Sequence, residues 1–183
     1  RINIDINKLQ NKDIELHRNI EFIINDSKFN KEVLEHFIDE LNKLKETLEQ
    51  EIHDLCVKYG ISNYSINLDG SIDVNGNVNL SYNKLRELPL KFNIVHGHFY
   101  CDNNKLTSLN KFPKFVGGDC NISYNNLTSL KGSIEYVVGY FDCSCNKLTS
   151  LKGSLLGVGY IFNCSYNQLA SLEGSPKDVK DKF

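Results

Sequence analysis

The chain has 183 residues, of which 40% are hydrophobic, and its net charge is −2. This length suits one domain or two small ones, and the balanced charge excludes the strong basic excess typical of nucleic-acid-binding proteins. No apolar run in it approaches the roughly 20 residues that span a membrane.

Residues 1–60 are predicted to form a helical region. Isoleucines at positions 2, 4 and 6 alternate with polar residues, which is a weak strand signal. The apolar residues of 13–25 fit one face of a helix that Asp13 would cap, whereas residues 20–24 fit a buried strand as well.

The clearest element of this region is a long amphipathic helix over about 31–59. Its apolar residues recur at steps of three and four: Leu34, Phe37, Leu41, Leu44, Leu48, Ile52, Leu55 and Tyr59. Neither Pro nor Gly interrupts it before Gly60, a suitable residue just past a helix end. Such a helix needs a partner along its apolar side. The alternatives are residues 13–25 in a helical hairpin, a second copy of the chain, or the helix of another protein.

Residues 61–76 are predicted to be a β-hairpin that caps the start of a solenoid. Alternating apolar residues lead into Asp69-Gly70 and resume at Ile72 and Val74. Asp-Gly between two such runs is a strong hairpin signal. A solenoid must cover the open end of its first turn, and the hairpin lies where that cover is needed.

From residue 77 to residue 183 one pattern returns every 21 residues, in five full turns and a partial sixth. An asparagine anchors each full copy, at Asn83, Asn104, Asn125, Asn146 and Asn167. Leucines follow two and five residues after each anchor, a valine follows at twelve, and apolar residues or cysteines precede it by three and five. A fixed period of this length indicates a solenoid.

Four of the six cysteines fall on the apolar positions of this pattern: Cys101, Cys120, Cys143 and Cys164. A cysteine there acts as a small core residue, so we expect free, buried thiols. Zinc needs converging ligands, and neighbouring Cys143 and Cys145 should point to different surroundings. We therefore predict no metal and no cofactor, and a reducing, cytoplasmic compartment fits best.

The stretch Phe-Asn-Cys-Ser-Tyr-Asn-Gln-Leu-Ala-Ser-Leu at 162–172 resembles the core of a leucine-rich repeat. The resemblance covers about 78–183. Short repeats ending in Leu-Thr-Ser-Leu resemble those of bacterial proteins, and Gly-Ser at the turn with Val-Gly before the strand resembles repeats encoded in tailed-phage genomes.

The helical region and the hairpin, joined to the repeats that this resemblance implies, predict an α+β protein: a helical N-terminal region, a hairpin cap and a short solenoid with one parallel sheet. The resemblance also implies that the anchoring asparagines bond backbone groups of neighbouring turns. The chain departs from the family pattern eight residues before the asparagine. The usual apolar position there holds His96, Gly117, Val138 and Gly159, and apolar character has moved to the valine one residue earlier.

Side chains alternate across a strand, so the residues between the apolar columns should face outward on a concave sheet. The outward residues vary between turns and are rich in aromatic, amide and carboxylate groups, and tyrosine supplies large contact area at low entropic cost. We predict a partner-binding face comprising His98, Tyr100, Asp102, Asp119, Asn121, Tyr124, Tyr140, Asp142 and Tyr166.

The sequence predicts a binding protein rather than an enzyme, because it has no nucleophile with an oriented base, no glycine loop feeding a helix and no metal-ligand set. If the phage resemblance holds, the protein partner would be a host defence or nucleic-acid-processing complex that this chain inhibits in the host cytoplasm. Two alternatives stay open. One is nucleic-acid binding through an edge stripe of Lys84, Lys105 and Lys147, and the other is self-assembly, such as a homodimer, through the N-terminal helix.

Overall fold

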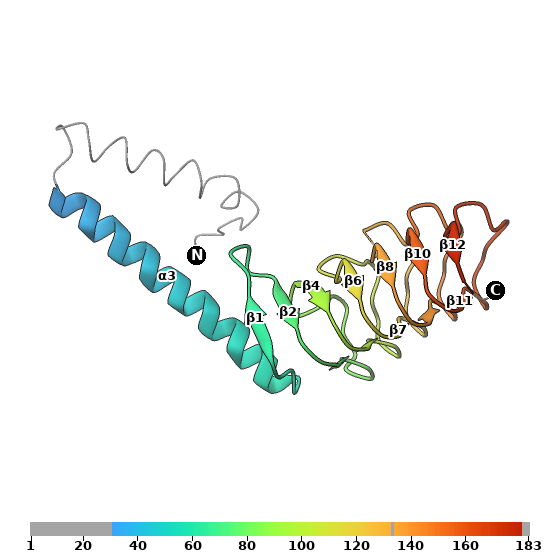
Figure 1. Ribbon diagram of the computed structural model, residues 1–183, viewed down its shortest axis with the longest axis horizontal. Coiled ribbons are helices and arrows are strands. Elements are labelled where there is room, and N and C mark those ends of the chain that lie inside the picture. The colour runs from blue at the N-terminus through green and yellow to red at the C-terminus, as the bar shows by residue number, and fades with distance from the viewer. Residues whose placement is uncertain (1–30, 133, 181–183) are drawn as a thin grey trace. The chain divides into compact units, whose positions relative to one another are not determined.

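The computed structural model describes residues 31–132 and 134–180, and Figure 1 shows it as a ribbon. The segments predicted at 2–6 and 13–25 lie outside these residues. The described chain begins with helix α3 and continues with twelve short strands. It divides into two compact units, and all twelve strands belong to the one formed by residues 54–66 and 71–183. The prediction of a helix followed by a short solenoid with parallel strands is confirmed.

Helix α3 spans Lys31–Lys58, against an expected span of about 31–59. It ends in a Schellman motif, in which the N–H of Ile61 donates to the carbonyl of Cys56 at 2.8 Å and that of Gly60 to Val57 at 3.2 Å. Gly60 takes the left-handed conformation that this motif requires, with φ +64°. Cys56 and Ile61, whose backbone groups this motif joins, are both buried.

A β-hairpin follows the helix, made of β1 (Tyr64–Ile66) and antiparallel β2 (Ile72–Val74). Its loop closes with a turn in which the N–H of Gly70 donates to the carbonyl of Asn67, and Gly70 has φ +70°. Strand β2 then pairs in parallel with the next strand of its sheet. The hairpin therefore supplies the first two strands of a longer sheet.

The expectation of a single parallel sheet is wrong, because every full turn contributes two short strands. One sheet has seven strands in the order β1-β2-β4-β6-β8-β10-β12 and the other has five in the order β11-β9-β7-β5-β3. After the hairpin, the seven-stranded sheet contains β4 (Phe92–Val95), β6 (Phe115–Val116), β8 (Tyr136–Val137), β10 (Gly157–Val158) and β12 (Asp178–Val179). The five-stranded sheet contains β3 (Val78–Asn79), β5 (Phe99–Tyr100), β7 (Cys120–Asn121), β9 (Phe141–Asp142) and β11 (Phe162–Asn163).

The seven-stranded sheet arises from the shift of apolar character to the valine column, which departs from the leucine-rich-repeat pattern. The valine column is itself a strand, and the chain bends between this strand and the next through glycine-rich corners. A Cβ atom at Gly159 would overlap the carbonyl oxygen of Val138 in the turn below, so this close stacking requires a glycine in at least one of the two neighbouring turns. The register is strict, since Phe99 pairs with Cys120 and Val116 with Val137, 21 residues apart.

The core lies between the two sheets. Its inward columns include the predicted ones, and Leu106, Leu127 and Leu148 are fully buried. A further inward column was not predicted from the sequence, because it mixes aliphatic, aromatic and proline residues. Its members are Phe92, Pro113, Ile134, Leu155 and Pro176. Aromatic rings join neighbouring turns, and Phe141 stacks on Phe162 with centroids 5.7 Å apart.

All six cysteines are free; Cys56, Cys101, Cys120 and Cys143 are buried, whereas Cys145 and Cys164 are partly exposed.

The asparagine ladder is present in the structure. Asn125 Nδ2 donates to the carbonyls of Cys101, one turn below, and Ile122, in its own turn, at 3.0 and 3.1 Å. Its Oδ1 accepts from the N–H of Leu106 at 2.9 Å. Asn104, Asn146 and Asn167 repeat this arrangement. These carboxamides therefore hydrogen-bond each turn to the one before it, so their regular spacing is a structural requirement.

In the part of the chain that the structure describes, no helix is long and apolar enough to cross a membrane.

Candidate binding face

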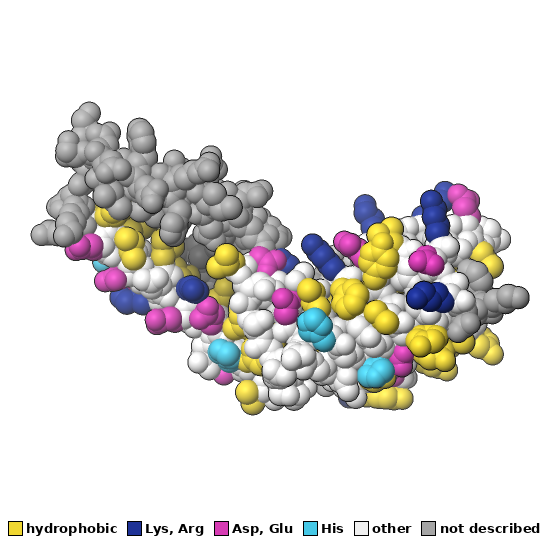
Figure 2. Space-filling model, in the orientation of Figure 1, with side chains coloured by type: hydrophobic (Ala, Val, Ile, Leu, Met, Phe, Trp, Pro, Cys, Tyr) yellow, Lys and Arg dark blue, Asp and Glu magenta, His cyan; other side chains and the backbone are white. Residues whose placement is uncertain are grey.

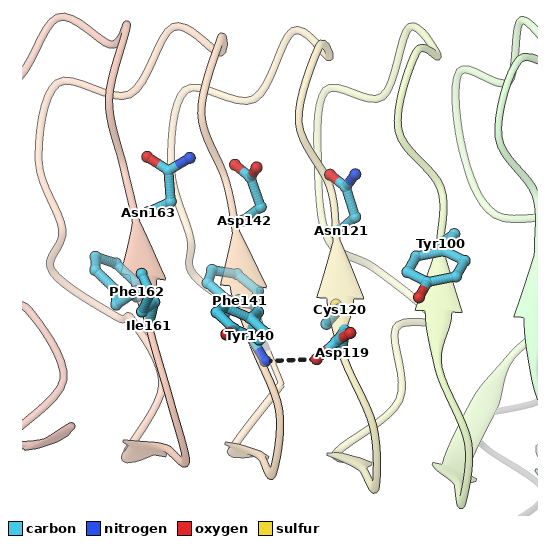
Figure 3. A pocket seen from close by; sticks show the side chains of 10 residues that line it. All are labelled: Tyr100, Asp119, Cys120, Asn121, Tyr140, Phe141, Asp142, Ile161, Phe162 and Asn163. Atoms are coloured by element: carbon cyan, nitrogen blue, oxygen red, sulfur yellow. Dashed lines mark hydrogen bonds between the residues drawn. The ribbon is translucent and has the colours of Figure 1, made fainter. Parts of the chain in front are cut away.

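An open groove of 420 Å³ lies on the outer side of the five-stranded sheet. Each strand there places one residue inward and the next outward, so that Phe99 is buried and Tyr100 partly exposed. The groove brings together five of the nine predicted site residues: Tyr100, Asp119, Asn121, Tyr140 and Asp142. Figure 3 shows Asn121, Asp142 and Asn163 in a row on consecutive strands, with Asp119 between Tyr100 and Tyr140.

The row of amides and carboxylates is fixed by bonds to the turns that follow the strands. Asn121 Oδ1 accepts from the N–H and the hydroxyl of Ser123, at 3.0 and 2.6 Å. Asp142 Oδ1 accepts from the N–H of Ser144 at 2.8 Å. These bonds close Asx turns. Each side chain is therefore held in one orientation where it lines the groove.

Ser123 and Ser144 correct an expectation of the sequence analysis, which places their column on the exposed face. Both are buried, at 4% and 6% exposure. Both serines belong to turns with a neighbouring turn on either side, whereas Ser165, which makes the same Asx turn in the last full copy, is exposed. The outward face is therefore narrower than simple alternation predicts.

A second column beside the groove forms a ladder of side chain to backbone bonds. Asn77 Oδ1 accepts from the N–H of His98 at 2.9 Å, and His98 Nδ1 accepts from the N–H of Asp119 at 2.9 Å. Asp119 Oδ1 accepts in turn from the N–H of Tyr140 at 2.8 Å, the bond drawn in Figure 3. His98 and Asp119, which the sequence analysis assigns to partner binding, thus also join successive turns.

Two stacked aromatic pairs each contribute one ring, Tyr100 or Tyr140, to the groove. His98 stacks on Tyr100 with centroids 5.5 Å apart and planes 13° from parallel, and Tyr140 stacks on Tyr160 at 5.6 Å and 19°. Desolvation, and then the nearby carboxylates of Asp119 and Asp102, raise the pKa of the Tyr100 phenol. Tyr100 therefore stays neutral and keeps its hydroxyl proton as a hydrogen-bond donor.

Asp102 lies two residues past β5 and does not line the groove. Its Oδ1 accepts from the hydroxyl of Ser81 at 2.6 Å, and its Oδ2 accepts from Nδ2 of Asn103 at 2.7 Å. Both oxygens are engaged locally. Its contribution to the face is therefore its negative charge, which adds to those of Asp119 and Asp142.

The remaining predicted residues, Tyr124 and Tyr166, lie where the strands end rather than in the groove. Their column takes the left-handed backbone conformation in every turn, with φ between 52° and 59° at Tyr82, Asn103, Tyr124, Cys145 and Tyr166. A hydrogen bond to the side chain of Cys145 is the main cause that raises the pKa of the Tyr124 phenol. These tyrosines form a separate exposed row along the margin of the sheet.

A second groove, also of 420 Å³, lies on the seven-stranded sheet and was not predicted from the sequence. Tyr136, Val138 and Tyr160 form its apolar wall, and Gly157 and Gly159 lie among its lining residues. Figure 2 shows hydrophobic side chains gathered over β6 to β10 on this face. The sequence signal for this groove is an aromatic residue directly before the valine in two turns, at Phe115 and Tyr136. Because the valine points inward in a strand, the aromatic residue before it points outward.

Within residues 31–132 and 134–180, no group of three or more His, Cys, Asp and Glu side chains could hold a metal ion. Comparison of the chain with protein-family models, curated proteins and solved structures finds no match. The chemistry of the faces themselves is therefore the basis for a functional proposal.

Proposed function

We propose that this chain is a non-enzymatic protein-binding module of the leucine-rich-repeat type, and that it binds its partner on the outer face of the five-stranded sheet. The observation that carries the proposal is the groove, which combines tyrosine rings with carboxylates on a rigid, strictly repeated backbone. The 21-residue period and the asparagine ladder support the family assignment.

The chemistry of the groove favours a basic partner surface. Asp119 and Asp142 line it, and none of the residues that line it is a lysine or an arginine. A partner arginine or lysine could lie against a tyrosine ring while its charged group meets a carboxylate, which combines cation–π and ion-pair attraction. The same carboxylates would repel the phosphates of a nucleic acid, so this face favours protein over nucleic acid.

A basic partner surface is also what nucleic-acid-processing proteins present to their substrates. A module that covers such a surface would exclude the nucleic acid sterically. We therefore keep, as the finer form of the proposal, an inhibitor that blocks a host nucleic-acid-processing or defence complex.

Affinity capture from the native host, followed by mass spectrometry, tests the proposal. The Tyr100→Ala/Tyr140→Ala double variant should lose capture of the partner, with a loss of about 2 kcal/mol or more, or roughly thirtyfold in affinity. Tyr136→Ala is the matched control, because Tyr136 and Tyr140 are 48% and 49% exposed, but Tyr136 is part of β8 in the seven-stranded sheet and Tyr140 directly precedes β9 in the five-stranded sheet. Capture that survives the double variant but fails with Tyr136→Ala would move the site to the second groove.

A further inference from the structure

Helix α3 carries an exposed apolar row that the proposed function does not use. Leu34, Phe37, Leu41, Leu44 and Leu48 follow one another at steps of three and four. Phe37 and Leu44 are 64% and 52% exposed, and no described residue of the row is fully buried. An alternation of three and four is the heptad spacing of a coiled coil, with the row at its core positions a and d.

The row is limited to the first two thirds of the helix. At the next heptad step the sequence has Glu51, and the apolar positions move to Ile52 and Cys56, which are buried. The last turns of α3 therefore have their packing partners within the chain. The heptad row before them is a separate surface, about 15 residues or roughly 22 Å long.

Charged residues beside the row distinguish the possible orientations of a second helix. With Leu41 at position a, Glu40 is at position g and Lys45 at position e. In a parallel, in-register pair, g of one helix faces e of the other five residues on, so Glu40 meets Lys45 of the second copy, twice. An antiparallel pair matches g with g and e with e. The g positions Val33, Glu40 and Thr47 include no cation and the e positions Ile38, Lys45 and Ile52 no anion, so this orientation offers no attraction.

We propose that the row binds the same row of a second copy of this chain, as a parallel two-stranded coiled coil over residues 33–48. Val33 and Ile38 are also exposed and lie at g and e, where they widen the apolar contact. Glu40 already pairs with Lys43 at 3.2 Å and Lys45 with Glu49 at 3.8 Å, but these pairs are largely exposed and exchange readily for contacts between chains. Two heptads form a short interface, so the dimer dissociates at low concentration.

Sedimentation velocity on the full chain, from low to high micromolar concentration, tests this. The mass should rise toward that of two chains, and Leu41→Lys should hold it at one chain. Asp39→Lys is the control, because it adds the same lysine at position f, on the side of the helix away from the row, and should leave the dimer intact. Circular dichroism of each variant reports whether α3 and the solenoid stay folded.

The charge pair gives an independent readout. Glu40→Lys and Lys45→Glu should each weaken the dimer, since each places like charges together twice, and mixing the two variants should restore a heterodimer. Disulfide formation reports the orientation. Leu44→Cys, at position d, should cross-link to itself under mild oxidation, whereas Glu46→Cys, at position f, should not.

Three results would overturn the proposal. They are a monomer throughout the concentration range, an assembly that Leu41→Lys does not affect, and failure of the mixed charge variants to associate. A monomer that Leu41→Lys destabilises would show that another segment of the same chain covers the row. Partner capture through the tyrosine groove is measured separately, so either proposal can fail without the other.

Discussion

His98 Nδ1 lies 2.9 Å from the backbone nitrogen of Asp119 and 3.3 Å from Oδ2 of the same residue. The first contact requires a ring nitrogen without a proton, because the backbone N–H is the donor. The second would require a proton on that nitrogen. The two are therefore alternatives, and the bond that continues the ladder through this column places the ring proton on Nε2.

The first prediction concerns this rung of the ladder. His98→Ala should lower the free energy of unfolding by about 1 kcal/mol, since the Asp119 N–H loses its acceptor. His98→Asn should restore most of it, because Asn77 holds the equivalent rung one turn below. Urea unfolding measures both, and nitrogen chemical shifts of His98 at neutral pH should show the Nε2–H tautomer. A loss in His98→Asn equal to that in His98→Ala would show that stacking on Tyr100, not the rung, is what matters.

The second prediction tests the asparagine ladder. Asn125→Ala should destabilise the solenoid by about 2–4 kcal/mol, because it leaves several buried backbone groups without a partner. Asn83→Ala is the matched control, since Asn83 is exposed and its side chain donates to Ser81 within its own turn. It should lower stability much less. Equal effects at the two positions would contradict a ladder that acts between turns.

The third prediction concerns the corners between the two sheets. Gly159→Ala should destabilise the fold, because the added Cβ overlaps the carbonyl of Val138 and backbone must move. Gly76→Ala should be nearly neutral, since its Cβ meets no atom within 4 Å and its φ is not positive. Thermal unfolding of the pair separates close approach from a general effect of replacing glycine in a corner.

The solenoid was predictable because its inward columns repeat with little variation, and the anchor is always asparagine. The second sheet was not, because the position after each valine alternates between glycine and a side chain, as at Gly117 and Val138. This alternation allows the backbones of neighbouring turns to approach closely. It does not bury apolar groups, and hydrophobic patterning detects only apolar burial.

The binding face was predictable to the extent that outward alternation placed Tyr100 and Tyr140 on one surface. The hydrogen bonds were not, because Asn121 and Asp142 bond backbone groups whose direction depends on the following turn. Only the structure shows that Ser123 is buried and that Tyr124 lies beyond the groove.

The fourth prediction concerns tyrosines held in a left-handed conformation. Tyr82 has φ +59° and is exposed, whereas Asn103 fills the same position one turn later with a residue better suited to it. Tyr82→Asn should therefore stabilise the solenoid by about 1 kcal/mol. Tyr140→Asn, at a position whose φ is not positive, should not stabilise it. A destabilised Tyr82→Asn variant would show that the tyrosine ring makes contacts that outweigh its backbone strain.

The fifth prediction concerns the buried thiols. Burial raises the pKa values of Cys101, Cys120 and Cys143 well above the ordinary 9.0. Above that value the unfolded chain loses thiol protons that the folded chain keeps. This deprotonation lowers the free energy of the unfolded state, so the stability of the fold falls as pH rises. The contribution is complete at neutral pH and is lost progressively from about pH 9 upward.

Cys120→Val isolates this effect, because Val78 fills the same inward column two turns earlier and a valine suits the site. The variant should lose less stability than the wild type between about pH 8 and about pH 10, since one titrating thiol is gone. Urea unfolding at the two pH values measures the difference, and the other titrating groups cancel because both proteins contain them. An identical loss in the two proteins would show that lysines and tyrosines, rather than the core thiols, govern the alkaline limit of this fold.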